Sequence, residues 1–278
     1  MDIEKAIAFI ESRGSELEKV RLHCLLHGTR PPADVIQKLI NLQNADGGFP
    51  FGMQPGMLST INETTVALWW LEEMDLLYSP IAHFAFDYLT STQQAEGYWD
   101  EDPRLAQYEL PHWIRLGDLY TQLYLTAYVA YWLAAAGKTN QPAFRKALHF
   151  LIINQDETGK ILGYLHTTWI ATGVFLMAGK RYTIFASKGE KVLSDRSLAE
   201  WEDSQLAWAL DCLNKGGLPK TEPFIRACLN ELNRRQQLDG SWASEDGEAS
   251  AVVATIQAIK VMKRYGLISM GSPGKVIW

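Results

Sequence analysis

Three carboxylates are grouped in the segment EWEDSQLAWAL, which spans residues 200–210. Glu200, Glu202 and Asp203 follow one another at short spacing. Carboxylates this close cannot all ionise together, so one of them is kept protonated and can act as a strong general acid. In the first turn of a helix, the same residues would instead cap the helix and interact favourably with its dipole. The segment therefore predicts either a proton donor or a helix start.

A second polar and aromatic segment, YWDEDPRLAQYELPHWIRLGDLY, runs from residue 98 to residue 120 and is the longest of its kind in the chain. Long loops in compact domains often carry function. Its candidate functional residues are Asp100, Glu101, Asp102, His112, Trp113, Arg115 and Asp118. His112 could orient a carboxylate or act as a base, or it could be a capping or packing residue. We expect Asp118 to cap the helix that follows.

Aromatic residues form the third candidate group, because the chain contains 10 tryptophans, more than packing alone requires. Four tyrosines are spaced 4, 4 and 3 residues apart, which places them on one face of a helix: Tyr120, Tyr124, Tyr128 and Tyr131. If this face lines a cavity, its π systems could stabilise carbocations and hold a polyene. The tryptophans expected nearby are Trp69 or Trp70, Trp169, Trp201 and Trp208. The alternative is an aromatic core between helices, although tyrosine hydroxyls prefer a partner or water.

Two further groups lie where helices are predicted to begin. His166 opens the sequence HTTW, and NETT occupies residues 62–65. Both groups could line the rim of one site, and helix capping is the alternative role for Asn62 and Thr167.

A repeat predicts the elements that position these residues. The pattern Gln-x3-Gly-x-aromatic begins at Gln43, Gln93 and Gln236, and a weaker copy that ends in Ile161 begins at Gln155. Each copy follows a stretch with apolar residues near i, i+3, i+4 and i+7, which predicts an amphipathic helix, and precedes a more apolar helix. We expect the Gly to end the helix in a left-handed turn, the Gln to cap freed backbone groups, and the aromatic residue to wedge between neighbouring units.

Six helix pairs can be assigned, each with an amphipathic outer helix and a more apolar inner helix. Four pairs flank the repeats, and two more are predicted at residues 2–28 and at about 182–214. Because every inner helix must bury its apolar face, six pairs close most simply into a ring of inner helices sheathed by outer ones. We therefore predict an all-α fold, a single (α/α)6 toroid formed by one domain over residues 1–278.

The turns of this repeat resemble the QW repeats of squalene-hopene cyclases and other class II terpene cyclases, and of the related prenyltransferase β subunits. The resemblance spans nearly the whole chain, although a full cyclase carries two helical domains and this chain has room for one. It implies a site in the central cavity, near the N-termini of the inner helices. It also implies an Asp-x-Asp-Asp-Thr-Ala motif, whose middle aspartate protonates an alkene or epoxide.

Residues 200–205 are similar to that motif. By this resemblance, Glu200 and Asp203 take the flanking carboxylate positions, and Glu202 takes the position of the acid. Ser204 and Gln205 stand in place of Thr and Ala, so Asp203 is the one identity. The Glu-for-Asp replacements depart from the geometry of the family motif.

Motifs for other chemistries are absent from the sequence. Prenyltransferase β subunits bind zinc through an Asp-x-Cys pair and a later His, whereas here Cys212 directly follows Asp211 and His166 is the last histidine. There is no D-D-x-x-D sequence for a magnesium diphosphate, and no P-loop, G-x-G-x-x-G, H-E-x-x-H or G-x-S-x-G motif. We therefore predict neither a metal nor a cofactor, and protein prenylation is not expected.

The charge and cysteine content of the chain limit the kinds of partner and compartment that we expect. A net charge of -6 with scattered basic residues argues against nucleic acid. Cys24, Cys212 and Cys228 lie far apart, which fits a reducing compartment. The N-terminal segment does not resemble a secretory signal, and no apolar run approaches the length of a membrane span. We expect a cytoplasmic protein with at most peripheral membrane contact.

Three functions fit these patterns. The first is an isoprenoid-handling enzyme, in which Glu202 or Asp203, assisted by Glu200, protonates a polyprenyl-type substrate to cyclise or isomerise it. The predicted substrate-binding residues are Tyr120, Tyr124, Tyr128, Trp169, Trp201, His112, Trp113, His166 and Trp69. The second is a non-catalytic toroid that binds a lipid-like ligand or a protein partner. The third is a carbohydrate-active barrel, in which Asp100 or Asp102 pairs with Glu202, although the repeats resemble the terpenoid proteins instead.

Overall fold

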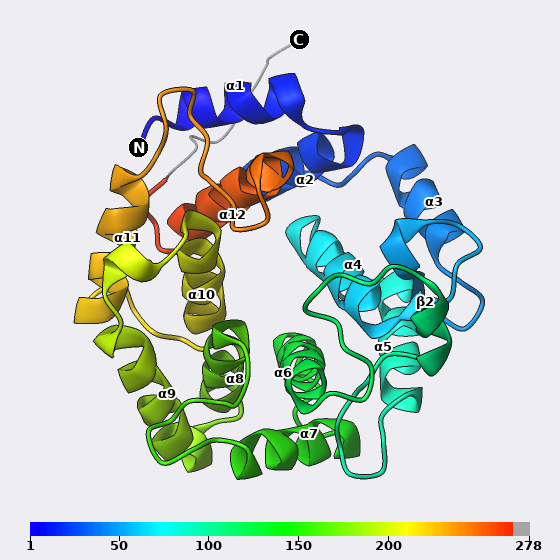
Figure 1. Ribbon diagram of the computed structural model, residues 1–278. Coiled ribbons are helices and arrows are strands. Elements are labelled where there is room, and N and C mark those ends of the chain that lie inside the picture. Colours follow the sequence, from blue (N-terminus) through cyan, green and yellow to red (C-terminus); the bar gives the residue numbers. More distant parts are fainter. Residues whose placement is uncertain (269–278) are drawn as a thin grey trace. The chain divides into compact units, whose positions relative to one another are not determined.

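The computed structural model describes residues 1–268, and this part of the chain is predominantly helical (Figure 1). The α-helices are α1 (Ile3–Arg13), α2 (Glu16–His27), α3 (Ala33–Leu42), α4 (Ile61–Glu73), α5 (Pro80–Ser91), α6 (Leu119–Ala135), α7 (Pro142–Ile153), α8 (Leu165–Met177), α9 (Thr183–Asp195), α10 (Asp203–Lys215), α11 (Pro223–Arg234) and α12 (Ala251–Arg264). The twelve α-helices of residues 1–268 are the number that the six predicted pairs require. Two short strands, β1 (Phe49–Pro50) and β2 (Ser59–Thr60), pair antiparallel ahead of α4.

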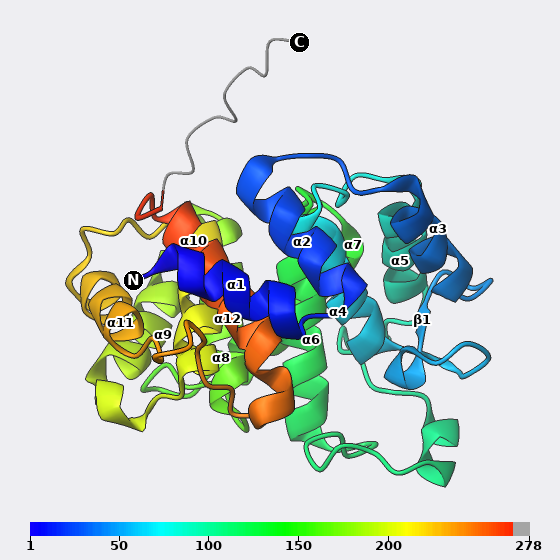
Figure 2. The same ribbon diagram turned by 90° about the horizontal axis from the view of Figure 1, so that it is seen from above.

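Contacts group the chain into two compact units. Over the described residues, unit 1 consists of residues 1–32, 73–75 and 196–268, and it holds α1, α2, α10, α11 and α12. Unit 2 consists of residues 33–72 and 76–195, and it holds α3 to α9 except for the end of α4. In unit 2, α6 packs against α7 and α8. In unit 1, α10 and α12 pack together and α1 lies against α12 (Figure 2).

Each repeat makes the same pair of hydrogen bonds. The Gln side chain donates from Nε2 to the carbonyl oxygen of its own Gly and to a carbonyl near the start of another outer helix, at 2.8–3.0 Å. The acceptors are Gly47 and Ile81 for Gln43, Gly97 and Ala143 for Gln93, Gly159 and Phe185 for Gln155, and Gly240 and Asp2 for Gln236. The Gln amide thus bonds backbone groups, as expected, and one of its two acceptors lies at the start of another helix, so the side chain also joins two helices.

The position of the Gly in each repeat differs from the predicted one. Helix α3 ends at Leu42, five residues before Gly47, so the Gly lies in the following turn and does not end the helix. Its left-handed φ is confirmed, as at Gly159, where φ is +105°. A Cβ at Gly159 would lie 2.3 Å from the carbonyl carbon of Lys188, so this turn approaches α9 too closely for any side chain.

The last residue of each repeat fixes the inner helix that follows. These residues, Phe49, Trp99, Ile161 and Trp242, are fully buried, and their wedging between neighbouring units stays a prediction. Their backbone N–H groups donate to threonine Oγ1 atoms on the inner helices at 2.9–3.2 Å, and the acceptors are Thr64, Thr126, Thr168 and Thr255. Since an α-helix has about 3.6 residues per turn, positions two or five residues from such a threonine lie on the face turned away from the repeat.

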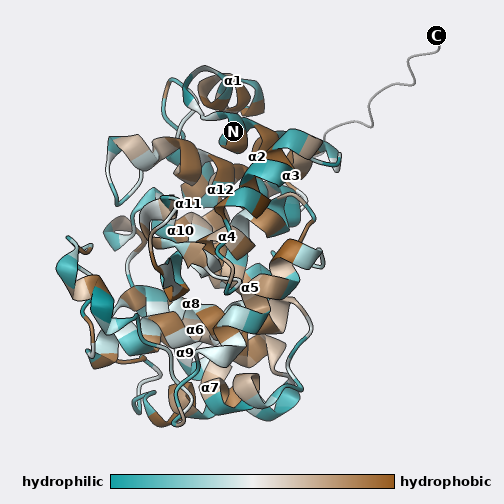
Figure 3. Cartoon of the chain, turned by 90° about the vertical axis from the view of Figure 1, so that its right-hand side faces the viewer, coloured by the Kyte–Doolittle hydropathy of each residue, from teal (hydrophilic) through white to brown (hydrophobic). Residues whose placement is uncertain are grey.

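Hydropathy follows the same division between helix faces. Helix α3 carries hydrophilic and hydrophobic residues side by side along its length (Figure 3), with Val35 and Leu39 buried. In unit 2, α4, α6 and α8 are more apolar than α3, α5 and α7, respectively, and α6 is buried from Leu123 to Ala134. Within residues 1–268, no helix combines the length and the apolar character needed to cross a membrane.

Candidate active site

Glu101 is the most deeply buried carboxylate of the segment 98–120 in unit 2. The backbone N–H groups of Ile61 and Asn62, at the start of α4, donate to its two carboxylate oxygens, each at 2.8 Å. The residue is 3% exposed. Burial raises the pKa of Glu101 to about 8, and the two backbone hydrogen bonds act in the opposite direction. A carboxyl with this pKa is largely protonated at neutral pH, which is what a general acid requires.

Asp100 and Asp102 have structural partners. Asp100 Oδ2 accepts hydrogen bonds from Gly117 N at 3.0 Å and from Gln122 Nε2 at 2.8 Å, so it joins the two ends of the loop. Asp102 pairs with Arg104 at 2.6 Å, and the hydrogen bond from that guanidinium lowers the pKa of Asp102. These two carboxylates therefore hold the loop in place.

Asp118 caps α6, as the sequence predicts. Its side chain accepts hydrogen bonds from Tyr120 N and Thr121 N at 2.9 and 3.3 Å. His112 is exposed on the loop ahead of this helix, and Trp113 is half-buried. The structure thus places His112 at the surface of unit 2 and Trp113 closer to α6.

A continuous aromatic row runs along α6. The ring of Trp113 lies 5.1 Å from Tyr124, Tyr124 lies 5.9 Å from Tyr128, and Tyr128 lies 6.0 Å from Trp132, measured between ring centroids. Tyr124 and Tyr128 flank Thr126 by two residues on either side, so they lie on the face of α6 turned away from the repeat. The predicted tyrosine stripe is present, and its buried part begins at Tyr124 because Tyr120 is 45% exposed.

Two other predicted residues lie on the corresponding faces of neighbouring inner helices in unit 2. Trp69 follows Thr64 by five residues on α4, and His166 precedes Thr168 by two residues on α8. Trp169, by contrast, is fully buried next to Thr168, with its ring 4.4 Å from that of His166. The faces of α4 and α8 that correspond to the tyrosine face of α6 therefore carry Trp69 and His166, respectively.

Trp201 belongs to unit 1 and has different neighbours. Its ring is buried, lies 6.4 Å from Phe224, and is covered by the Arg196 guanidinium at 5.9 Å. The predicted set of substrate-binding residues is thus divided between the two units, with all members except Trp201 in unit 2.

The EWED carboxylates, also in unit 1, form the start of a helix. The second helix of the pair predicted at about residues 182–214 begins at Asp203, and residues 198–200 form a separate 3-10 turn. Glu202 is exposed and occupies the N-cap position, where its backbone N–H donates to Gln205 Oε1 at 3.2 Å. Glu200 is exposed and lies 3.6 Å from Arg196 Nε. The predicted helix start is confirmed, and the acid role of these residues stays a prediction.

Asp203 is buried and joins three segments of unit 1. Its carboxylate accepts hydrogen bonds from an Arg235 guanidinium nitrogen at 3.2 Å and from Ala243 N at 3.1 Å. Arg235 also donates to the carbonyl oxygen of Leu198 at 2.6 Å and to that of Trp201. Arg235 was not predicted, because nothing in its local sequence indicates a partner more than thirty residues away.

A second buried group of charges in unit 1 was also missed. Glu73 accepts a hydrogen bond from Arg21 Nε at 2.7 Å and lies 3.5 Å from Lys260 Nζ. Lys260 lies 3.2 Å from Asp211, which also pairs with Arg264. These residues come from four separate segments, so no local spacing predicts their contact.

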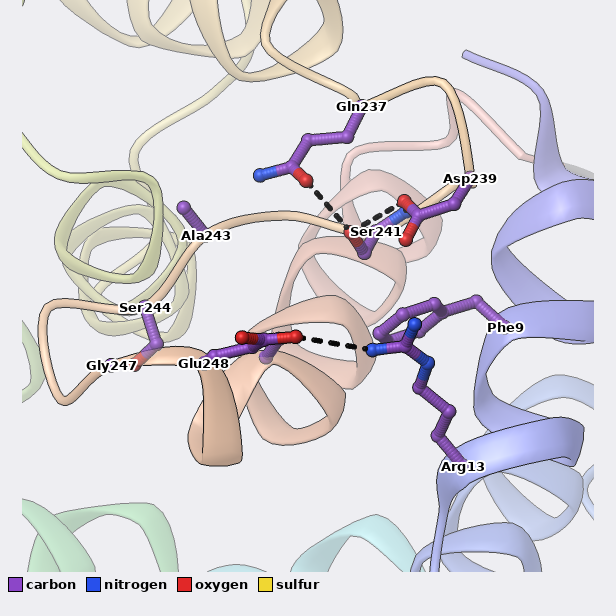
Figure 4. Close-up of a pocket in the computed structure, with 10 residues that line it drawn as sticks. Phe9, Arg13, Gln237, Asp239, Ser241, Ala243, Ser244, Gly247 and Glu248 are labelled. Atoms are coloured by element: carbon purple, nitrogen blue, oxygen red, sulfur yellow. Dashed lines mark hydrogen bonds and ion pairs between the residues drawn. The ribbon is translucent and has the colours of Figure 1, made fainter.

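A pocket of about 270 Å³ lies between α1 and the last repeat in unit 1 (Figure 4). Arg13 faces Glu248 at 3.5 Å, and the Ser241 hydroxyl donates to Gln237 and Asp239 at 3.3 and 2.7 Å (Figure 4). These polar groups hold the turn of the repeat, and none of the predicted site residues lines the pocket. Over residues 1–268, no group of three or more His, Cys, Asp or Glu could hold a metal ion.

Comparisons with known proteins identify the fold. No family model and no curated protein matches the sequence. A variant of the type II terpene cyclase MstE from Scytonema, in complex with geranylgeranyl dihydroxybenzoate (substrate), is 16% identical with a TM-score of 0.64, over 96% of this chain and 97% of that chain. Another MstE variant, in complex with merosterolic acid A (product), is 17% identical with a TM-score of 0.63, over 94% and 95% of the two chains.

A larger enzyme shares the same fold over part of its length. The ent-copalyl diphosphate synthase from Streptomyces platensis is 14% identical with a TM-score of 0.57, and the match covers 94% of this chain and 49% of the synthase. The predicted all-α fold class is thereby confirmed. This chain has the fold of these cyclases.

Proposed function

We propose that this protein is an isoprenoid-handling enzyme that protonates a polyprenyl-type substrate and cyclises or isomerises it. The observation that carries this proposal is the aromatic row Trp113, Tyr124, Tyr128 and Trp132, whose two tyrosines lie on the α6 face turned away from the repeat. Stacked π faces suit both an apolar polyene and a cation derived from it. The fold supports the same class of ligand, since MstE was solved with geranylgeranyl dihydroxybenzoate as substrate.

The reaction needs a proton donor and a surface that stabilises positive charge. The acid gives its proton to one carbon of an alkene, the π electrons form the new C–H bond, and the other carbon becomes a cation. A further double bond attacks this cation to close a ring, or a neighbouring C–H bond loses its proton to restore an alkene. The proton gained equals the proton lost, so the reaction is an isomerisation that consumes no co-reactant.

Among the carboxyls described above, Glu101 fits the acid role best. Burial raises its pKa to about 8, so it carries a proton at neutral pH. The predicted acids have less suitable surroundings, because Glu200 and Glu202 are exposed and Asp203 is engaged by Arg235. We therefore place Glu101 first as the acid and keep Glu202 and Asp203 as the alternative.

One experiment distinguishes these assignments. Wild-type protein, Glu101→Gln and the double variant Glu202→Gln/Asp203→Asn are incubated with geranylgeranyl diphosphate, squalene and prenylated aromatic acids, and products are identified by mass spectrometry. We expect a cyclised or isomerised product from wild type and from the double variant, and none from Glu101→Gln with its fold intact by circular dichroism. If Glu101→Gln forms product and the double variant does not, the role of the acid would be assigned to Glu202 or Asp203.

A non-catalytic isoprenoid-binding protein is the second candidate. It is favoured by the helix-capping and ion-pairing contacts of the EWED carboxylates. Tight binding of geranylgeranyl diphosphate by all three forms without any product would support it. The carbohydrate alternative also stays a prediction, and the Asp102–Arg104 ion pair does not favour Asp102 as its catalytic carboxylate.

A further inference from the structure

Trp113 is held in place through its backbone. Its carbonyl oxygen accepts one hydrogen bond from the Tyr164 hydroxyl at 2.9 Å and another from Thr121 Oγ1 at 3.1 Å. Thr121 Oγ1 in turn accepts the N–H of Arg115 at 3.0 Å. The loop is therefore bound at this residue both to α6 and to the segment that opens α8.

Trp113 is also the outermost member of the aromatic row. Its ring is half-buried and meets Tyr124 edge-on at 5.1 Å, whereas Tyr124, Tyr128 and Trp132 are 8%, 2% and 2% exposed. A ligand that approaches the row along α6 from this end therefore meets the indole of Trp113 first.

Exposed apolar side chains lie beside this end of the row. Leu119, Tyr120 and Leu162 are 38%, 45% and 42% exposed. The segment of Leu162 lies against α6, because a Cβ placed on Gly163 would be 2.9 Å from the Tyr120 side chain. The Tyr120 and Tyr164 rings are 6.4 Å apart, so these residues adjoin the group that holds Trp113. Neighbouring exposed apolar residues of this kind favour contact with an apolar ligand.

The loop has a second attachment that is independent of Trp113. Asp100 joins Gly117 N and Gln122 Nε2, which keeps the two ends of the loop together. Breaking the hydrogen bond from Tyr164 to the Trp113 carbonyl would therefore loosen the indole, while Thr121 and Asp100 keep the loop attached to α6.

We propose that Trp113 is a gate to the aromatic row and that the Tyr164 hydroxyl is the group that keeps it closed. An isoprenoid chain enters beside Leu119, Tyr120 and Leu162 once the hydrogen bond from Tyr164 to Trp113 opens. This inference rests on the proposed function for its ligand class. It assigns Tyr164 a positioning role, since Tyr164 acts through Trp113.

The test measures binding kinetics, which are separate from turnover. Geranylgeranyl diphosphate is mixed rapidly with each protein, and the change in tryptophan fluorescence gives the association and dissociation rate constants. Tyr164→Phe removes one hydroxyl and keeps the ring, and we expect both rate constants to rise about fivefold, the effect of losing one neutral hydrogen bond, with Kd changing by less than about twofold. Trp113→Ala should raise both rate constants further.

Tyr182→Phe is the matched control. Tyr182 is half-buried, and its hydroxyl makes no hydrogen bond within the part of the chain that the structure describes, so its rate constants should equal those of wild type. Wild-type rate constants in Tyr164→Phe would overturn the inference. A faster dissociation with unchanged association would overturn it as well, because Tyr164 would then be a direct ligand contact. Absence of binding by wild type would instead refute the proposed function.

Discussion

Substituting Glu101 with glutamine tests the balance of forces around this carboxyl. Burial favours the protonated form, while the N–H groups of Ile61 and Asn62 and the positive end of the α4 dipole favour the ionised form. Glutamine has nearly the same shape and cannot ionise. The variant therefore removes the titration and keeps the position of the side chain.

The free energy of unfolding is expected to change with pH in a definite direction. The pKa of Glu101 rises from 4.5 to about 8 in the folded protein. A carboxyl whose pKa is raised on folding gives its full stabilising contribution below pH 4.5, and that contribution is lost as the pH rises through 8. A difference of this size corresponds to at most about 5 kcal/mol. We expect the free energy of unfolding of wild type, relative to Glu101→Gln, to fall by several kcal/mol, on the order of 3–5, across this range.

Urea denaturation at a series of pH values between 4.5 and 8.5, followed by circular dichroism, measures this difference. Glu109→Gln is the matched control, because Glu109 is exposed on the same loop and should leave the pH dependence of wild type unchanged. Glutamine also places an NH2 group near a backbone N–H, which costs about 1–3 kcal/mol at every pH and does not alter the slope. A slope that is identical in wild type and Glu101→Gln would show that Glu101 stays ionised, and would remove it as the acid.

Three further substitutions test the scaffold by urea denaturation. Gly159→Ala should cost about 3 kcal/mol or more, because φ is +105° and the new Cβ meets α9, whereas Gly137→Ala, with φ of +71° in open space, should cost about 1 kcal/mol; equal costs would contradict the close approach. Glu73→Gln should cost about 3–5 kcal/mol, because it leaves the buried Arg21 charge without its carboxylate, and a loss below about 1 kcal/mol would mean that the ion pair is dispensable. Gln93→Leu should cost about 1–3 kcal/mol through its two lost hydrogen bonds, and a neutral result would refute the joining role of the repeat.

The helices were predictable because their determinants are local. Apolar periodicity and the recurring turns predict twelve helices, and the structure begins and ends most of them within a few residues of the predicted positions. The tyrosine stripe of α6 was predictable for the same reason, since spacings of 4, 4 and 3 fix a helix face without knowledge of the rest of the fold. Asp118 followed from the same kind of local pattern, as a helix cap.

The partners of the charged residues were not predictable, because they depend on contacts between distant segments. Glu101 bonds to residues 61 and 62, forty residues earlier, and Asp203 bonds to Arg235 and Ala243. The resemblance of EWED to a catalytic motif and its use as a helix start have the same local pattern, so the spacing alone could not separate them. The burial of Glu101, which makes it a candidate acid, exists only once the loop has folded against α4.

The last repeat has a consequence for the order in which the protein can fold during synthesis. Gln236 donates to the carbonyl oxygen of Asp2 and accepts from its N–H, so this pair of hydrogen bonds joins residues 234 positions apart. The ribosome releases α1 early, yet the hydrogen bonds between Asp2 and Gln236 can form only after almost the whole of the described chain has emerged. The other three repeats bridge 30 to 50 residues and can form as soon as the next outer helix appears. Unit 2 can therefore mature during translation, while unit 1 is completed only after its last helices leave the ribosome.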